Sequence, residues 1–153
     1  MQTRSKIIYE HTQRMGWRLW GPIIIVFSVA AYFGFGYRQY EGFLVFGILL
    51  VIGYLYGSLT VKVDSERLRF YFGPGLVSKS FQLAKIGSCR VVRNKWYYGG
   101  GIHLTPNGMI YNVAGLDGIE LQLLSGRKVR IGTDEPRRLC ELITQQIQDK
   151  QRT

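Results

Sequence analysis

Two stretches near the N-terminus contain no charged residue, and each has the length of a membrane-spanning helix. The first covers residues 19–37 and the second covers residues 42–61. At ~1.5 Å per residue the first stretch would extend about 28 Å, close to the hydrocarbon thickness of a bilayer. The second is rich in Leu, Ile, Val and Phe, which favour insertion. The pattern predicts a transmembrane helical hairpin over residues 19–61, preceded by a basic cytoplasmic segment over residues 1–18.

The surroundings of this hairpin predict its orientation. Only residues 38–41 separate the two stretches, so both ends of the hairpin must lie on the same side of the membrane. Lys and Arg flank the hairpin at both ends, and positively charged flanks stay in the cytoplasm. We therefore expect both termini to be cytoplasmic. A cleaved signal peptide is the alternative for the first stretch, but it would need a shorter apolar core and a small-residue cleavage site.

Small residues recur four positions apart in both predicted helices. Gly53 and Gly57 form a GxxxG pattern, and Ala30 and Gly34 form a similar pair. Such spacing lets two helices approach closely. It predicts packing within the hairpin, with packing against a partner protein as the alternative. The absence of charged residues inside either stretch argues against an ion pathway.

After residue 61 the apolar run gives way to alternation of apolar and polar residues, which is typical of β-strands. Turn-forming residues such as Gly73-Pro74-Gly75 and Ser125-Gly126 separate the alternating segments. Roughly seven strands joined by short hairpins predict an antiparallel barrel or sandwich. The predicted strands lie within residues 61–64, 67–72, 76–83, 86–93, 102–105, 119–123 and 128–131.

The chain is predicted to end in an amphipathic helix. Thr133 or Asp134 can cap its N-terminus, and Pro136 is tolerated in the first turn. Apolar residues then follow at helical spacing and form one stripe: Leu139, Leu142, Ile143 and Ile147. We expect this helix to cover an open end or face of the sheet, which makes residues 62–153 an α+β cytoplasmic domain.

The order of these elements, and three motifs, resemble a known family. The motifs are Tyr97-Tyr98-Gly99-Gly100-Gly101-Ile102, Tyr111-Asn112-Val113-x-Gly115 and a helix start that runs from Gly126-Arg127 to Pro136. They resemble small two-span bacterial membrane proteins with a pleckstrin-homology-like (PH-like) domain. The resemblance covers about a third of the chain. It implies a PH-like fold, a location in the bacterial inner membrane and no catalytic activity.

Charge and cysteine content narrow the possible partners. The chain has 20 Lys and Arg against 10 Asp and Glu, a formal net charge of +10. This balance suits anionic lipid, and it also suits nucleic acid, although a membrane tether makes nucleic acid the weaker hypothesis. Cys89 and Cys140 have no metal-ligand spacing, and we expect them to be reduced and buried. We predict neither a metal nor a cofactor.

Lys62, Arg67 and Arg69 are the candidate lipid or phosphate site. Their spacing matches the basic pattern that phosphoinositide-binding PH domains carry on their first hairpin. Guanidinium and ammonium groups can hold a lipid phosphate through charge-assisted hydrogen bonds. The alternative is that Lys62 only anchors the preceding helix at the headgroups.

A second basic segment runs into aromatic residues and is the candidate partner-binding site. It could bind a partner peptide, the membrane interface or single-stranded nucleic acid. The alternative is a solvated strand edge with its aromatics in the core. Its members are Arg90, Arg93, Lys95, Trp96, Tyr97 and Tyr98. The adjacent glycines at residues 99–101 lack the following Lys-Ser/Thr and helix of a phosphate loop.

These patterns predict a non-enzymatic, membrane-anchored scaffold or accessory subunit that mediates protein–protein assembly. His11 and His103 lie far apart in the sequence, with no nucleophile or acid in a catalytic pattern. We expect a homo-oligomer or a subunit of a larger membrane complex, with the edge near residues 76–83 as a docking strand. The alternative function is an anionic-lipid-binding or lipid-sensing module.

Overall fold

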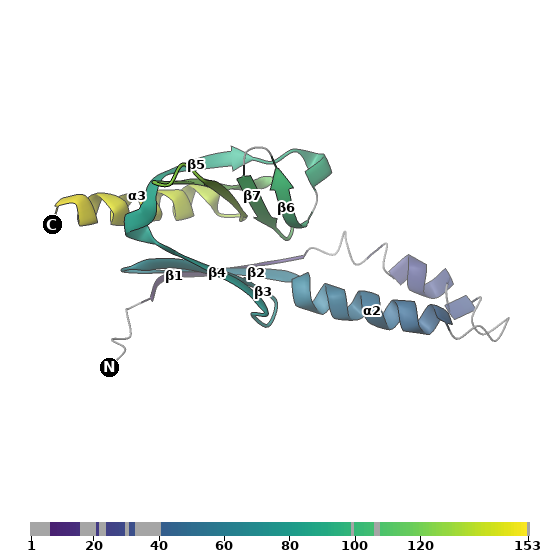
Figure 1. Cartoon of the computed structure of the whole chain (residues 1–153). Coiled ribbons are helices and arrows are strands. Elements are labelled where there is room, and N and C mark those ends of the chain that lie inside the picture. The colour runs from purple at the N-terminus through teal and green to yellow at the C-terminus, as the bar shows by residue number, and fades with distance from the viewer. Residues whose placement is uncertain are drawn as a thin grey trace.

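The chain folds into two β-sheets, a C-terminal helix and a helical arm that projects from one sheet (Figure 1). This computed structural model describes residues 7–15, 21, 24–29, 31–32, 41–98, 100–105 and 108–152. Nine strands and two α-helices have defined bounds within these residues. The arm contains α2 (Glu41–Tyr56), and the C-terminal helix is α3 (Pro136–Arg152).

The first sheet has four antiparallel strands in the order β1-β2-β3-β4. The second sheet has five strands in the order β5-β8-β9-β7-β6, and its β7–β9 pair is parallel. The first-sheet strands are β1 (Ile7–Arg14), β2 (Ser58–Asp64), β3 (Arg67–Phe72) and β4 (Val77–Gln82). Those of the second are β5 (Ile86–Arg93), β6 (Gly101–Thr105), β7 (Gly108–Asn112), β8 (Asp117–Leu123) and β9 (Lys128–Gly132). Short 3₁₀ helices, η1 (Leu83–Lys85) and η2 (Trp96–Tyr98), precede and follow β5.

One hydrophobic core lies between the sheets and is closed by α3. Alternate residues of each strand point inward because side chains alternate between the two faces of a strand. The inward set includes Leu68, Phe70 and Phe72 of β3, all almost completely buried. Leu139 and Ile143 of α3 belong to the same core, and α3 packs against β5, β8 and η1. The predicted apolar stripe of the C-terminal helix therefore faces the core, as expected.

The strand count of the predicted fold is wrong, because β1 and β7 escaped recognition. In β1 the inward positions are Tyr9, His11 and Gln13, so an apolar alternation is missing. In β7 the apolar residues run without alternation, since the consecutive residues Ile110 and Tyr111 point to opposite faces and are both buried. The structure thus places a strand from the predicted N-terminal segment 1–18 in the first sheet, so the described strands number nine rather than seven.

The predicted transmembrane hairpin is also wrong. The second predicted span, residues 42–61, is divided in the structure: α2 ends at Tyr56 and β2 begins at Ser58. Alternating β2 residues such as Leu59 and Val61 had lengthened the apolar run, and they are buried in the core. Of the first predicted span, residues 21, 24–29 and 31–32 are helical, and the rest lies outside the described residues.

No helix among the described residues has the length and apolar character needed to cross a membrane. This finding removes the basis for the prediction of a multi-pass protein of the bacterial inner membrane with two cytoplasmic termini. The membrane-protein assignment is therefore corrected, along with the hairpin on which it rested.

The prediction of reduced cysteines differs from the structure as well. Cys89 of β5 and Cys140 of α3 form a disulfide, with their Cα atoms 5.7 Å apart. They lie 51 positions apart in the sequence, and only the packing of α3 on β5 brings them together. A pair so distant carries no sequence pattern that could reveal it.

Candidate functional site

The arm presents the largest set of exposed apolar side chains among the described residues. No charged residue occurs between residues 42 and 56. The exposed side chains cover more than half of the circumference of α2, whereas the face that contains Phe46 and Gly53 is covered. They are Leu44, Val45, Ile48, Leu50, Val51, Ile52 and Tyr54. A helix that is apolar all round is normally a buried helix, so α2 has the surface of an element that something else covers.

Part of that cover comes from the preceding helical residues. The rings of Phe27 and Phe46 lie 3.8 Å apart between centroids. Figure 1 shows this segment beside α2, at the end of the molecule away from the sheets. Residues 24–26 nevertheless remain exposed on the arm. The arm therefore already packs helix on helix, and apolar surface is left over.

The base of the arm is fixed to the first sheet at several points. β1 and β2 are paired neighbours, so the arm is an insertion between two hydrogen-bonded strands. The Met15 N–H donates to the Gly57 carbonyl at 2.7 Å, which extends this pairing to the start of the arm. The Gly73 N–H donates to the Ser58 carbonyl at 2.9 Å. The turn between β3 and β4 thus supports the end of α2.

Glycines make this junction possible. Gly73 has a φ of +46°, and a Cβ there would lie 2.7 Å from the Tyr54 carbonyl oxygen and closer still to that of Leu55. A side chain would force the turn away from α2. At Gly57 a Cβ would collide with the Gly53 carbonyl, so this half of the predicted GxxxG pair lies at the bend after α2. Ala30 and Gly34, the other predicted packing pair, lie outside the described residues.

The predicted lipid site lies on the outer face of the first sheet. Lys62 of β2 is opposite Arg69 of β3, and Arg67 is two residues earlier on the same face. The Lys62 Nζ lies 2.9 Å from a carboxylate oxygen of Glu10 on β1. This hydrogen bond raises the pKa of Lys62, and the ring of Tyr71 lies 5.7 Å from its Nζ. Lys62 is therefore held by its neighbours, whereas Arg67 and Arg69 are exposed.

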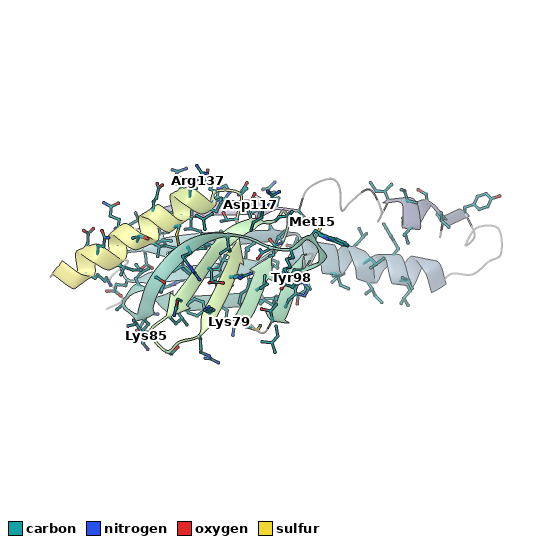
Figure 2. The ribbon with its side chains drawn as sticks, turned by 90° about the horizontal axis from the view of Figure 1, so that it is seen from above. Met15, Lys79, Lys85, Tyr98, Asp117 and Arg137 are labelled. Carbon is teal, nitrogen blue, oxygen red and sulfur yellow. A yellow bond between two sulfur atoms is a disulfide. The ribbon has the colours of Figure 1, made fainter. Side chains whose placement is uncertain are left out.

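The structure does not bring all of the predicted partner-binding residues together. Arg90 points from β5 to Glu120, with 2.7 Å between its Nη2 and the carboxylate. Arg93 ends β5, and Lys95 leads into η2, where Trp96 is highly exposed and Tyr98 is half-buried. The side chain of Tyr97 lies outside the described residues. Tyr98 lies at the end of the domain where Met15 begins the arm (Figure 2).

Glu120 carries a buried charge, and no pattern in the sequence predicted a role for it. Only 3% of its side chain is exposed, and it receives hydrogen bonds from Arg90 and from the Arg130 Nε at 2.8 Å. The three residues are cross-strand neighbours on β5, β8 and β9. Burial alone would raise the pKa of Glu120, but the hydrogen bonds from Arg130 and Arg90 outweigh it and lower that pKa. Arg90 is thus tied to the sheet.

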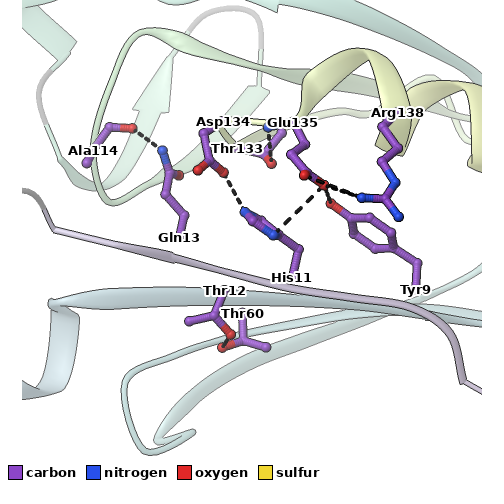
Figure 3. A network of polar contacts seen from close by, with 10 residues as sticks. All are labelled: Tyr9, His11, Thr12, Gln13, Thr60, Ala114, Thr133, Asp134, Glu135 and Arg138. Carbon is purple, nitrogen blue, oxygen red and sulfur yellow. Dashed lines mark hydrogen bonds and ion pairs between the residues drawn. The ribbon is translucent and has the colours of Figure 1, made fainter.

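A polar cluster joins β1 to the start of α3 (Figure 3). The Tyr9 hydroxyl donates to Glu135 at 3.1 Å, and the His11 Nε2 lies 2.6 Å from an Asp134 carboxylate oxygen. Gln13 donates to the Ala114 carbonyl at 2.8 Å. Burial raises the pKa of Tyr9, and the Glu135 hydrogen bond adds to the effect. Tyr9, His11 and Gln13 are the inward positions of β1. Because they are polar, the sequence shows no apolar alternation here, and the strand was not predicted.

This cluster resembles an acid–base site in composition, since it contains a histidine, a tyrosine and two carboxylates. A catalytic group must face a space that admits substrate. The cavities between the sheets and beside α3 do not include these side chains. The hydrogen bonds of this cluster connect the N-terminal strand to the start of α3, and we call it the β1–α3 latch. That the protein is not an enzyme stays a prediction.

Comparison with known proteins adds no identification: no family model matches the chain, and no curated protein matches it. The PH-like resemblance of the three sequence motifs therefore stays a resemblance. The described residues form two sheets and a C-terminal helix. The nine strands and the arm between β1 and β2 depart from the predicted seven-stranded form.

Proposed function

We propose that this protein is a non-enzymatic assembly subunit whose helical arm packs against the arms of other copies of the same chain. The observation that carries the proposal is the apolar surface of α2, exposed over more than half of its circumference and held away from the β domain (Figure 1). Seven large side chains are involved. Monomeric proteins rarely leave a contiguous apolar surface of this kind in water.

Charge favours the arms as the contact between copies. The chain carries a formal net charge of +10, so β domains repel one another at short distance. Residues 42–56 are uncharged. Arms that project from the charged domains can therefore meet without opposing like charges. The observed contact of Phe27 with Phe46 is the same kind of helix-on-helix packing that such an assembly would extend.

The magnitude of the apolar contact indicates more than a simple pair. Complete burial of a large aliphatic side chain contributes roughly 1.5–3 kcal/mol, so seven give on the order of 10 kcal/mol. Association costs about 4–15 kcal/mol in lost translational and rotational freedom. One face of one arm would therefore give weak pairing. A bundle that covers several faces of each α2 gives stable assembly.

Size measurement of the full chain in a mild non-ionic detergent tests this proposal. We expect a discrete oligomer by light scattering with the detergent contribution subtracted. Ile48→Lys should shift it to the monomer, since a buried ammonium in the bundle costs several kcal/mol. Ile7→Lys is the matched control, because Ile7 and Ile48 are each 52% exposed and Ile7 lies at the opposite end of β1 from the arm. A monomeric wild type, or equal dissociation by both variants, would overturn the proposal.

Binding of anionic lipid is the second candidate, favoured by one observation. Arg67 and Arg69 are exposed on the same face, and neither forms an ion pair with a carboxylate of the described residues. Lys62 contributes less than predicted because Glu10 holds it. Titration with a short-chain phosphatidylglycerol below its micellar concentration tests this. The Arg67→Gln/Arg69→Gln variant should lose the binding, and unchanged binding would reject the site.

A further inference from the structure

Two adjacent cavities form a groove along the open side of the β domain, opposite the side that α3 closes. The first, about 430 Å³, includes Arg67, Lys85 and Leu124. The second, about 630 Å³, includes Lys79, Arg127 and Lys128. Phe81 and Leu123 line both cavities, so the two lie side by side. In Figure 2, Lys79 and Lys85 lie on one long side of the domain and Arg137 lies on the other.

The groove combines an apolar floor with a cationic rim. Its floor includes Phe81, Met109, Tyr111 and Val129, which come from both sheets. Five cations line the two cavities, and no carboxylate does. None of the five forms an ion pair with a carboxylate in the described part of the chain. By contrast, Lys62, Arg90 and Arg130 each have an acidic partner. The five cations of the groove are therefore available to an anionic ligand.

Strand β4 forms one wall of the groove and is an edge strand. Among the described strands it pairs with β3 alone, so the backbone N–H and C=O groups of its other edge have no described strand beside them. Its side chains are mostly polar and exposed. An edge of this kind accepts an added strand, which contributes main-chain hydrogen bonds while pockets receive alternate side chains.

We infer that this groove binds an extended acidic segment of a partner protein, in which carboxylates alternate with apolar side chains. The segment adds to the edge of β4, its apolar side chains contact the floor, and its carboxylates meet the five cations. The six residues of β4 match a segment of about 20 Å. This site is separate from the arm, so it does not rest on the assembly proposed above.

Two other occupants fit the groove less well. A second copy of this chain would bring the same net charge of +10 and the same five cations to the β4 edge, and like charges repel at short distance. An anionic lipid concentrates its charge in one headgroup, whereas these cations are spread over two cavities along the groove. A lipid also lacks the repeated N–H and C=O groups that match a strand edge.

Fluorescence anisotropy with a labelled probe peptide tests the inference. The probe is a blocked hexapeptide of alternating Glu and Val, and the protein is the full chain in mild non-ionic detergent. We expect saturable binding of this peptide and none of its Lys-Val counterpart. A version with every backbone amide nitrogen methylated should lose the binding, because it cannot donate hydrogen bonds to β4.

Matched charge variants locate the site. Arg127→Gln/Lys128→Gln should weaken binding about tenfold or more through the loss of two charge-assisted contacts. Arg137→Gln/Lys150→Gln removes the same charges from exposed positions on α3 and should change affinity less than about twofold.

Three outcomes would overturn the inference. They are no binding of the acidic peptide, equal weakening by both double variants, and undiminished binding of the methylated peptide. If the methylated peptide is bound and short-chain phosphatidylglycerol competes with it, the groove binds anions without strand addition. The oligomeric state of the detergent-held chain is measured separately, so a failure of this inference is distinct from a failure of the assembly proposal.

Discussion

The β domain and the arm are both rich in apolar residues, but the domain buries these side chains and the arm leaves most of them exposed. In β3 the inward side chains of Leu68, Phe70 and Phe72 are almost fully buried, and charged residues alternate with them. In α2 apolar residues occupy all sides and most stay exposed. A strand needs only one covered face, which the opposite sheet supplies. A helix that is apolar all round needs cover on every side, and the β domain does not provide it.

The two regions also differ in what secures them. The domain combines a single core with the Glu120 ion pairs, the β1–α3 latch and the Cys89–Cys140 disulfide. The arm is attached at its base, where Gly73 lies close to the end of α2. Stability of the domain should therefore respond to substitutions in its core and networks, while substitutions along the arm should change assembly. Four experiments test this contrast.

The largest effect is expected in the core. Phe70→Ala removes a fully buried ring that lies 4.8 Å from the ring of Tyr111, between centroids. We expect the free energy of unfolding to fall by about 3–5 kcal/mol. Ile48→Ala on α2 should change the unfolding of the sheets by less than about 0.5 kcal/mol. Urea unfolding followed by far-ultraviolet circular dichroism measures both, and similar losses would remove the distinction between the two regions.

The junction between domain and arm should be the next most sensitive. Gly73→Ala combines a positive φ with a close approach to the Tyr54 and Leu55 carbonyls, and should cost about 2–4 kcal/mol. Gly126→Ala is the control, because Gly126 has a φ of +81° and no atom within 4 Å of an added Cβ. It should cost about 1 kcal/mol. Thermal unfolding of both variants measures the difference, and equal losses would show that the contact with α2 contributes nothing.

The Glu120 network predicts an acid dependence of domain stability. Glu120→Gln should lower the free energy of unfolding by about 1–3 kcal/mol at pH 7, since Arg90 and Arg130 lose their shared carboxylate. The pKa of Glu120 is lower in the folded state, so its contribution is present above the ordinary value of 4.5 and is lost as pH falls through the folded pKa. Denaturant unfolding at a series of pH values should give a shallower acid loss for the variant. Parallel curves would contradict this assignment.

The β1–α3 latch should have the smallest effect and the opposite pH dependence. Tyr9→Phe removes the hydrogen bond to Glu135 and should cost about 1 kcal/mol near neutral pH. Burial raises the pKa of Tyr9, so the neutral phenol stabilises the fold below the ordinary value of 10.0, and this contribution is lost as pH rises above it. The difference in unfolding free energy between wild type and variant should therefore narrow from pH 9 to pH 11. A difference in unfolding free energy that stays constant with pH would show that the Tyr9 phenol does not contribute to the latch.

Much of the β domain could be predicted from the sequence, because alternation and turn residues are local signals. The predicted segments 67–72 and 86–93 coincide with β3 and β5. The pattern from Leu139 to Ile147 likewise gave the inner face of α3. The prediction failed where the local pattern was ambiguous. Residues 42–61 read as one apolar run because a helix and a largely buried strand follow each other with only Gly57 between them.

The candidate sites could be predicted less well, because they depend on residues that are distant in the sequence. Arg90 read as a free cation, and the structure pairs it with Glu120 on another strand. Lys62 read as a phosphate ligand, and the structure pairs it with Glu10 of a strand that had not been recognised. The edge near residues 76–83 was predicted to dock a partner strand. The structure adds to it a groove whose cations come from both sheets.

The sequence by itself determined the periodicities: an apolar helix near the N-terminus, alternating strands after it, and an amphipathic helix at the end. Periodicity follows from the backbone geometry of each element, so it is written in neighbouring residues. Only the tertiary structure decided that β1 pairs with β2 across the arm, that the two cysteines meet, and which cations keep an acidic partner. These features are contacts between segments far apart in the chain. They form because burial of the shared hydrophobic core stabilises the fold that brings those segments together.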